Sequence, residues 1–298
     1  MPLLMRFVAA LTILASAAAT SVAQNAEPPE TEQAPTDDPS TWRPEVKKAY
    51  DEILALPATP KDTLKDAMLE LAGKGRLARP AIAAIARQAD LPEPHRVFGG
   101  VLVVRFARFD VAALRKLAVD ANPFAQNDAI VFLSTLGGTE NAEFLADLAK
   151  KTTTDWVKRH VEGLAKKPPV EPLPARALEL LDKIINADAD AKKLASAILA
   201  EDFGKAAASA LAEIVPDPVA DDDTRTFAAI ALVQVNSESV PDLESLCARK
   251  NHKTLRYCAV VELAKKGAEG EAVLRKLAGD PTEPLKKRID ALLEAPRK

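Results

Sequence analysis

The apolar positions of this chain repeat every 30 to 35 residues, measured from eight start points of which six are basic. The residue three positions after each start is mostly small, and the residue seven positions after it is apolar, Leu in six of the eight cases. A fixed period of this length indicates an array of supersecondary units. The start points are Lys65, Arg96, Gln126, Val157, Lys192, Arg225, Arg256 and Lys286.

The spacing within each period predicts two helices joined by short turns. Apolar residues at helical spacing follow the start points, and Gly137, Asn236 and Gly267 each stand eleven residues after one, where helices commonly end. In three repeats a second apolar set follows that turn. These sets are Val111, Leu114 and Leu117; Val240, Leu243 and Leu246; and Val273, Leu274 and Leu277.

One pair of such helices cannot bury its apolar face alone, so stacked neighbours must complete the core. We therefore predict an all-α fold, an α-solenoid of about eight antiparallel helix pairs over residues 42–298. The composition agrees, because Ala and Leu dominate the apolar content, while Gly numbers 11 and aromatic residues make up 4%.

Three segments depart from the regular pattern. Val97–Val104 is β-branched and contains two Gly, so local propensity favours a strand, whereas the register predicts a helix in which Gly99 allows close helix approach. The proline-rich segment 167–174 and the acidic segment 216–223 interrupt the repeats. Each of these two loops either bends the array or divides it into halves.

Acidic or Asn turns precede several start points, and a small residue, a Leu and a Gly follow some of them. This order resembles HEAT-like repeats of the short bacterial type, over roughly residues 60–295. The resemblance implies a binding scaffold. A minority of relatives are bilin lyases or DNA glycosylases, and neither active-site signature is found in this sequence. The matching segments are Asp221 to Arg225 with Ala228, Ala229 and Leu232; Asn251 to Arg256 with Ala259, Leu263 and Gly267; and Asn122 to Gln126 with Ala129, Leu133 and Gly137.

The N-terminus has the features of an export signal. Residues 1–23 carry one positive charge, an apolar run of thirteen residues and small residues before a predicted cleavage site after Ala23. The alternative is a retained membrane anchor, but the run is shorter than the ~20 residues that span a bilayer. Residues 24–41 are rich in proline and acids and predict a disordered spacer. We expect a bacterial protein that is periplasmic or secreted.

Charge and motifs narrow the function classes. The net charge is −3, and nucleic-acid binding normally needs a basic surface, so no nucleic-acid partner is expected. No second apolar run is long enough for a membrane span, and no membrane insertion is expected after cleavage. The short motifs of serine hydrolases, phosphate-binding loops, zinc proteases and thiol redox sites are missing. We predict no cofactor and no metal.

The basic start residues have two interpretations. They form a cationic ladder that binds an acidic partner, or each pairs with an acidic or Asn residue of a nearby turn, where exposed pairs contribute only ~0–1 kcal/mol. The candidate partner contacts are Arg96, Trp156, His160, Arg225, Arg256 and Tyr257. Most were chosen because Arg, Trp and Tyr dominate binding energy at interfaces.

Histidines and acidic clusters give weaker signals. His160 occupies a small-residue position beside Trp156, as an interior histidine or as part of a site. The loop from Asn186 spaces oxygen ligands as a calcium loop does, but Ala191 and Ala197 replace its Gly and its Glu, so we favour helix capping. Helix capping is also the favoured role of the acidic segment 217–223.

Cys247 and Cys258 lie on consecutive predicted helices of one repeat. An oxidising compartment permits a disulfide between them, provided that their Cα atoms lie within about 7 Å. The alternative is a pair of buried free thiols. Neither residue has neighbours arranged to make it a nucleophile.

The sequence therefore predicts a non-enzymatic scaffold that binds a protein partner in an extracytoplasmic compartment. Two alternatives remain open at this point. One is an enzyme or a lyase-like maturation factor on the same fold, with His160 and Trp156 in its pocket. The other is a structural component of the envelope.

Overall fold

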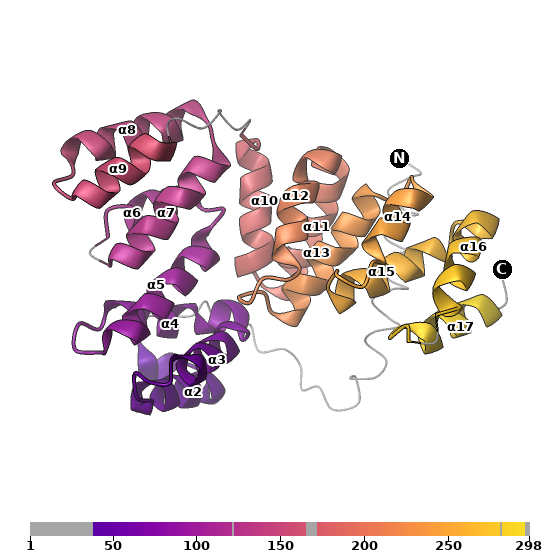
Figure 1. Cartoon of the computed structure of the whole chain (residues 1–298), viewed down its shortest axis with the longest axis horizontal. Helices are drawn as coiled ribbons and strands as arrows, with labels where there is room; N and C mark the ends of the chain where they lie inside the picture. Colours follow the sequence, from indigo (N-terminus) through magenta and orange to yellow (C-terminus); the bar gives the residue numbers. More distant parts are fainter. Residues whose placement is uncertain (1–37, 121, 165–171, 281, 296–298) are drawn as a thin grey trace. The chain divides into compact units, whose positions relative to one another are not determined.

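The computed structural model describes residues 38–120, 122–164, 172–280 and 282–295, and this part of the chain is helical, with no strand assigned within it (Figure 1). The predicted signal peptide 1–23, residues 24–37 of the predicted spacer and most of the segment 167–174 lie outside the described residues. Residues 39–41, at the end of the predicted spacer, form a short 3-10 turn. None of the described helices is long and apolar enough to cross a membrane.

All eight start residues lie in helices, as the register predicts. We call the helices that carry them the first helices. They are α3 (Lys61–Ala72), α5 (Glu93–Ala107), α7 (Pro123–Leu136), α9 (Asp155–Leu164), α11 (Ala189–Phe203), α13 (Asp222–Val235), α15 (Lys253–Leu263) and α17 (Lys286–Glu294).

The remaining helices either precede the first start point or follow a first helix. Two of the three apolar sets expected there coincide with a helix from end to end, and the third lies inside one. These helices are α2 (Pro44–Ala55), α4 (Arg79–Arg87), α6 (Val111–Leu117), α8 (Thr139–Lys151), α10 (Ala175–Asn186), α12 (Ala208–Ile214), α14 (Val240–Leu246) and α16 (Gly267–Ala278).

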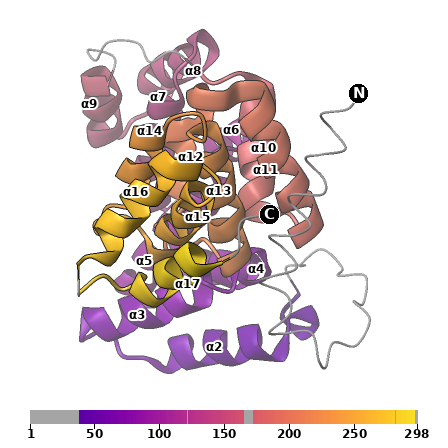
Figure 2. The same ribbon diagram turned by 90° about the vertical axis from the view of Figure 1, so that its right-hand side faces the viewer.

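Successive first helices pack on one another in two series. Helices α3, α5, α7 and α9 contact in that order, and so do α11, α13 and α15, which lie side by side in both views (Figures 1 and 2). Most residues three and seven positions after the start points are buried in these contacts, as Leu133, Leu199 and Leu263 show.

The buried side chains form two apolar clusters that share α5. Leu102 and Phe106 of α5 belong to the first cluster, with residues of α2–α4 and α10–α17. Val104 and Ala107, from the opposite side of α5, belong to the second cluster, with residues of α6–α9. Because α5 is buried on both sides, its sequence is apolar all round, which explains why Val97–Val104 looks like a strand although it is helical.

Gly99 permits the close approach of α4 and α5 that its position predicts. A Cβ atom placed on Gly99 would lie 2.9 Å from the backbone nitrogen of Ala86 and 3.0 Å from its Cα atom. These atoms belong to a helix backbone that cannot move aside as a side chain can. A side chain at this position would therefore push the two helices apart.

Candidate functional site

The start residues hold the ends of the preceding helices. In four repeats the side chain of the start residue donates a hydrogen bond to a backbone carbonyl eight or nine residues earlier. Three of these carbonyls lie at a helix C-terminus, and the fourth, that of Asp217, lies in the turn after α12. The last carbonyls of a helix lack intrahelical partners and favour positive charge, which explains why this position is mostly basic. The pairs are Gln126 with Ala118 (3.0 Å), Arg225 with Asp217 (3.1 Å), Arg256 with Cys247 (2.9 Å) and Lys286 with Ala278 (3.0 Å).

Arg256 is 6% exposed, and its guanidinium points into the molecule, so it does not lie on the surface as a partner contact would. It donates to Glu283, which is 7% exposed. Arg225 is more accessible, with 22% of its side chain exposed, but it contacts the Asp217 carbonyl and lies 3.7 Å from the Asp222 carboxylate. The surface role expected for Arg256 from the sequence does not fit this burial.

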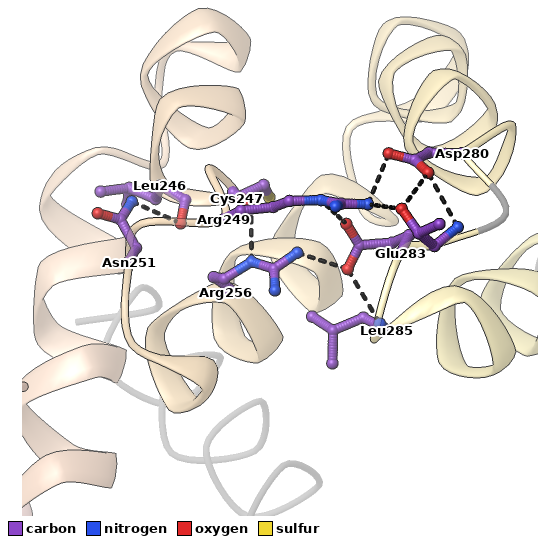
Figure 3. A network of polar contacts seen from close by, with 9 residues as sticks. Leu246, Cys247, Arg249, Asn251, Arg256, Asp280, Glu283 and Leu285 are labelled. Atoms are coloured by element: carbon purple, nitrogen blue, oxygen red, sulfur yellow. Dashed lines mark hydrogen bonds and ion pairs between the residues drawn. The ribbon is translucent and has the colours of Figure 1, made fainter.

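Figure 3 shows the polar network around Arg256. Arg249, in the turn before α15, donates to Asp280 Oδ2 (2.6 Å) and to Thr282 Oγ1 (2.5 Å) in the turn before α17. Glu283 accepts a further hydrogen bond from the backbone nitrogen of Leu285 (3.0 Å). Hydrogen bonds from Thr282, with help from Arg249, lower the pKa of Asp280. The network therefore links the turns that precede α15 and α17.

A second buried network joins α10, α11 and α13. Lys192 Nζ lies 2.8 and 2.6 Å from the carboxylate oxygens of Asp221 and 2.7 Å from Thr224 Oγ1, which donates to the Ile184 carbonyl (3.1 Å). Burial opposes the charge of Asp221, but Lys192 and Thr224 together hold its pKa below the usual value. Asp221 also caps α13 by accepting from the Thr224 backbone nitrogen. Asp221 thus has the helix-capping role that was predicted for the acidic segment 217–223, whereas Asp217 of the same segment does not cap a helix.

Asp217 ties the loop after α12 to the C-terminal end of α5. Its carboxylate accepts from Arg105 (3.1 Å) and from the buried Arg108. Burial lowers the pKa of Arg108, although the charge of Asp217 opposes this shift. Asn186 reinforces the same junction, because its amide donates to the Phe106 carbonyl (2.8 Å). These contacts join segments that are far apart in the sequence.

The calcium-like loop does what the capping interpretation predicts. Asp188 caps α11 by accepting from the Ala191 backbone nitrogen (2.9 Å), and Asn186 donates to Asp182 as well as to Phe106. Within the described ranges, no group of three or more His, Cys, Asp or Glu side chains is arranged to hold a metal ion.

The three histidines lie on different helices or turns. His95 is fully buried in α5, and its Nε2 lies 3.1 Å from the Ile53 carbonyl. His252 caps α15 and accepts from the Thr254 backbone nitrogen (3.3 Å). Burial, with the nearby charge of Arg225, lowers the pKa of His252.

Trp156 and His160 lie one turn apart on α9, so the structure places them on the same helix face as the sequence indicates. Trp156 is partly buried and packs against the second apolar cluster. The buried Nε2 atom of His160 has no hydrogen-bond partner among the residues that the structure describes.

Arg96, on α5, is partly buried, and its backbone carbonyl accepts a hydrogen bond from the Asn122 amide (2.9 Å).

Both cysteines are buried free thiols, so of the two alternatives for them the structure shows the unbonded one. Burial raises the pKa of Cys247 to about 12 and that of Cys258 to about 11. Each side chain is therefore a protonated thiol at neutral pH, and it fills apolar space in the first cluster.

The surface of the first helices carries apolar side chains that neither cluster accounts for. They stand one, two or five positions after a start point, or two before it, and are partly or well exposed. Tyr257 is the one candidate from the sequence that lies among them, at 37% exposed. The set on α5 and α7, which we call the N-terminal strip, is Val97, Val101, Phe124 and Val131. The set on α11, α13 and α15, which we call the C-terminal strip, is Leu194, Phe227, Tyr257 and Val261.

Helical geometry places these strips away from the core. Positions one and five after a start lie on the helix face opposite positions three and seven, which face the apolar clusters. In α3, α9 and α17 the same surface positions hold charged residues such as Asp66, Lys158 and Lys287. The apolar surface residues therefore lie on α5 and α7, the interior helices of the first series, and on all three helices of the second series.

No protein-family model matches this chain, and no curated protein matches it either.

Proposed function

We propose that this protein is an exported scaffold, an α-solenoid of HEAT-like helix pairs, which binds a protein partner across the first helices. The observation that supports this most is the pair of apolar strips. Leu194 is 62% exposed, and Phe124, Val131 and Tyr257 are each 36–37% exposed, on helices whose opposite faces are buried. Large apolar side chains grouped on a soluble surface mark interaction sites more often than single ones do.

The internal polar contacts support a rigid binding surface. The cations at the start positions are used to fix helix ends, as Lys192, Arg225 and Arg256 show. Rigid helices hold the strip residues in place before a partner arrives, so less conformational entropy is lost on binding. Tyr257 is of a residue type that contributes much of the affinity of typical protein interfaces, and the apolar side chains around it add buried surface.

The experiment is a capture in which the strips are changed one at a time. The chain from Gln24, tagged at its C-terminus, is incubated with the native extracytoplasmic fraction, and retained proteins are identified by mass spectrometry. We expect one retained protein to be lost with Leu194→Asp or with Val131→Asp. Both residues are exposed, so these changes leave the core intact.

Val119→Asp is the matched control. Val119 is 61% exposed, as Leu194 is, but it stands in the turn after α6 and outside both strips. A protein retained equally by all three variants binds elsewhere, and that result contradicts the proposed surface. If the wild-type chain retains no specific protein, the scaffold function itself is wrong.

A further inference from the structure

The exposed ring of Tyr257 lies within a group of cationic side chains on α15 and α17. The guanidinium carbon of Arg288 lies 5.2 Å from the centroid of the Tyr257 ring. Lys253 stands one turn before Tyr257 on α15 and is exposed, so both side chains emerge from one helix face. Lys287, beside Arg288, is also exposed. We call Lys253, Tyr257, Lys287 and Arg288 the Tyr257 patch.

The cations of this patch lack the acidic partners that their neighbours have. Residues 249–298 contain thirteen Lys and Arg against seven Asp and Glu, in a chain whose net charge is −3. Nearby cations are paired, as Lys265 is with Glu262 (2.8 Å) and Arg275 with Glu271 (2.6 Å). Within the described part of the chain, no carboxylate forms an ion pair with the three cations of the patch. The patch therefore carries uncompensated positive charge.

The contact with the Tyr257 ring positions Arg288 to bind a carboxylate. A guanidinium over an aromatic face can still donate two parallel hydrogen bonds, because the ring uses none of its N–H groups. A carboxylate accepts such a pair in bidentate geometry, and these charge-assisted bonds are about twice as strong as neutral ones. Val261, one turn beyond Tyr257, continues the C-terminal strip beside the patch.

We propose that the Tyr257 patch binds an acidic, amphipathic peptide segment of the partner, with a carboxylate on Arg288 and an apolar side chain on the C-terminal strip. This inference rests on the proposed scaffold function and names the chemistry of its partner. A nucleic acid fits less well, because Asp222 and Asp223 are exposed at the start of the adjacent helix α13 and would repel a continuous phosphate backbone.

The test is a fluorescence-anisotropy titration of the full mature chain. The probes are fluorescein-labelled twelve-residue peptides in which Glu and Leu alternate at spacings of two, three or four residues. Each has a matched peptide with Gln in place of Glu, and a single-stranded oligonucleotide of equal charge serves as a further probe. The variants are Arg288→Ala and Arg288→Lys, with Arg275→Ala as the control, because Arg275 is an exposed cation already paired with Glu271.

We expect at least one Glu–Leu peptide to bind, and its Gln counterpart to bind at least tenfold more weakly. Arg288→Ala and Arg288→Lys should both weaken binding at least fivefold, whereas Arg275→Ala should leave it unchanged. Equal binding of the Glu and Gln peptides, tighter binding of the oligonucleotide, or binding of no peptide overturns this inference. The scaffold function survives that outcome if the captured protein still depends on Leu194, so the two failures can be told apart.

Discussion

Replacing Glu283 with Ala should cost a large share of the stability of the C-terminal repeats. Glu283 and Arg256 are 7% and 6% exposed, and the carboxylate accepts from both Arg256 and the backbone of Leu285. Removing it leaves a buried guanidinium without its counter-charge, a change that typically costs about 3–5 kcal/mol. Because the Cys247 carbonyl still accepts from Arg256, we expect the lower half of that range, about 3–4 kcal/mol.

Two further variants separate the charge from the packing. Arg249→Ala removes a cation whose side chain is 51% exposed, so the loss of its contacts should cost only about 0–1 kcal/mol. The double variant Arg256→Met with Glu283→Leu removes both buried charges, and it should be more stable than Glu283→Ala alone, since a buried ion pair is often matched by an apolar pair.

Urea unfolding followed by circular dichroism at 222 nm measures these differences from the shift in midpoint. Hydrogen exchange of the α17 amides adds a local readout, because the network fixes the turn before that helix. Faster exchange in α17 than in α5 should accompany the loss of Glu283. A destabilisation by Glu283→Ala no greater than that of Arg249→Ala, or a double variant less stable than the single one, would refute this reasoning.

Three shorter predictions concern other helices. Gly99→Ala should destabilise the protein by about 1–3 kcal/mol despite the better helix propensity of Ala, because the added methyl meets helix backbone; thermal unfolding measures it, and an increase in melting temperature would contradict it. The pKa of His252 is lowered in the folded state, so its neutral ring contributes to the stability of the fold fully above pH 6.5, and this contribution is lost as the pH falls below that value. His252→Asn, which keeps the cap, should flatten the decline in stability between pH 7 and 5. Cys247 and Cys258 should react with a thiol reagent only in denaturant, and rapid labelling of the native protein would show that the thiols are accessible.

The register of the repeat could be predicted from the sequence because it depends on local periodicity. The apolar triplet that begins at Val111 marks α6 from end to end, and the triplet that begins at Val240 marks α14 in the same way. Gly99 could be placed at a close helix approach because every other repeat holds a side chain there. These features follow from positions within one repeat.

Whether the basic side chains at the start positions point toward the core or toward the surface was harder to predict, although their position in the repeat indicates it. A start residue stands three and seven positions before buried residues, so it shares their helix face, and Arg256 follows this rule with its burial. We instead expected Arg256 to contact a partner because Arg is one of the residue types that dominate binding energy at interfaces. Its partner Glu283 stands in the turn before α17, where the next repeat begins. No periodicity in the sequence reveals that contact.

The shared position of α5 also sets an order in which parts of the chain can fold. Arg105 at the end of α5 contacts Asp217, 112 residues later, whereas the helices α6–α9 complete their own cluster with neighbouring segments. Contacts between distant residues form slowly, because a long loop must close before they contribute. The contacts of α5 with α3, α4, α6 and α7 can thus form early in synthesis, whereas the contacts of its C-terminal end with Asn186 and Asp217 wait until the chain has been extended past α12.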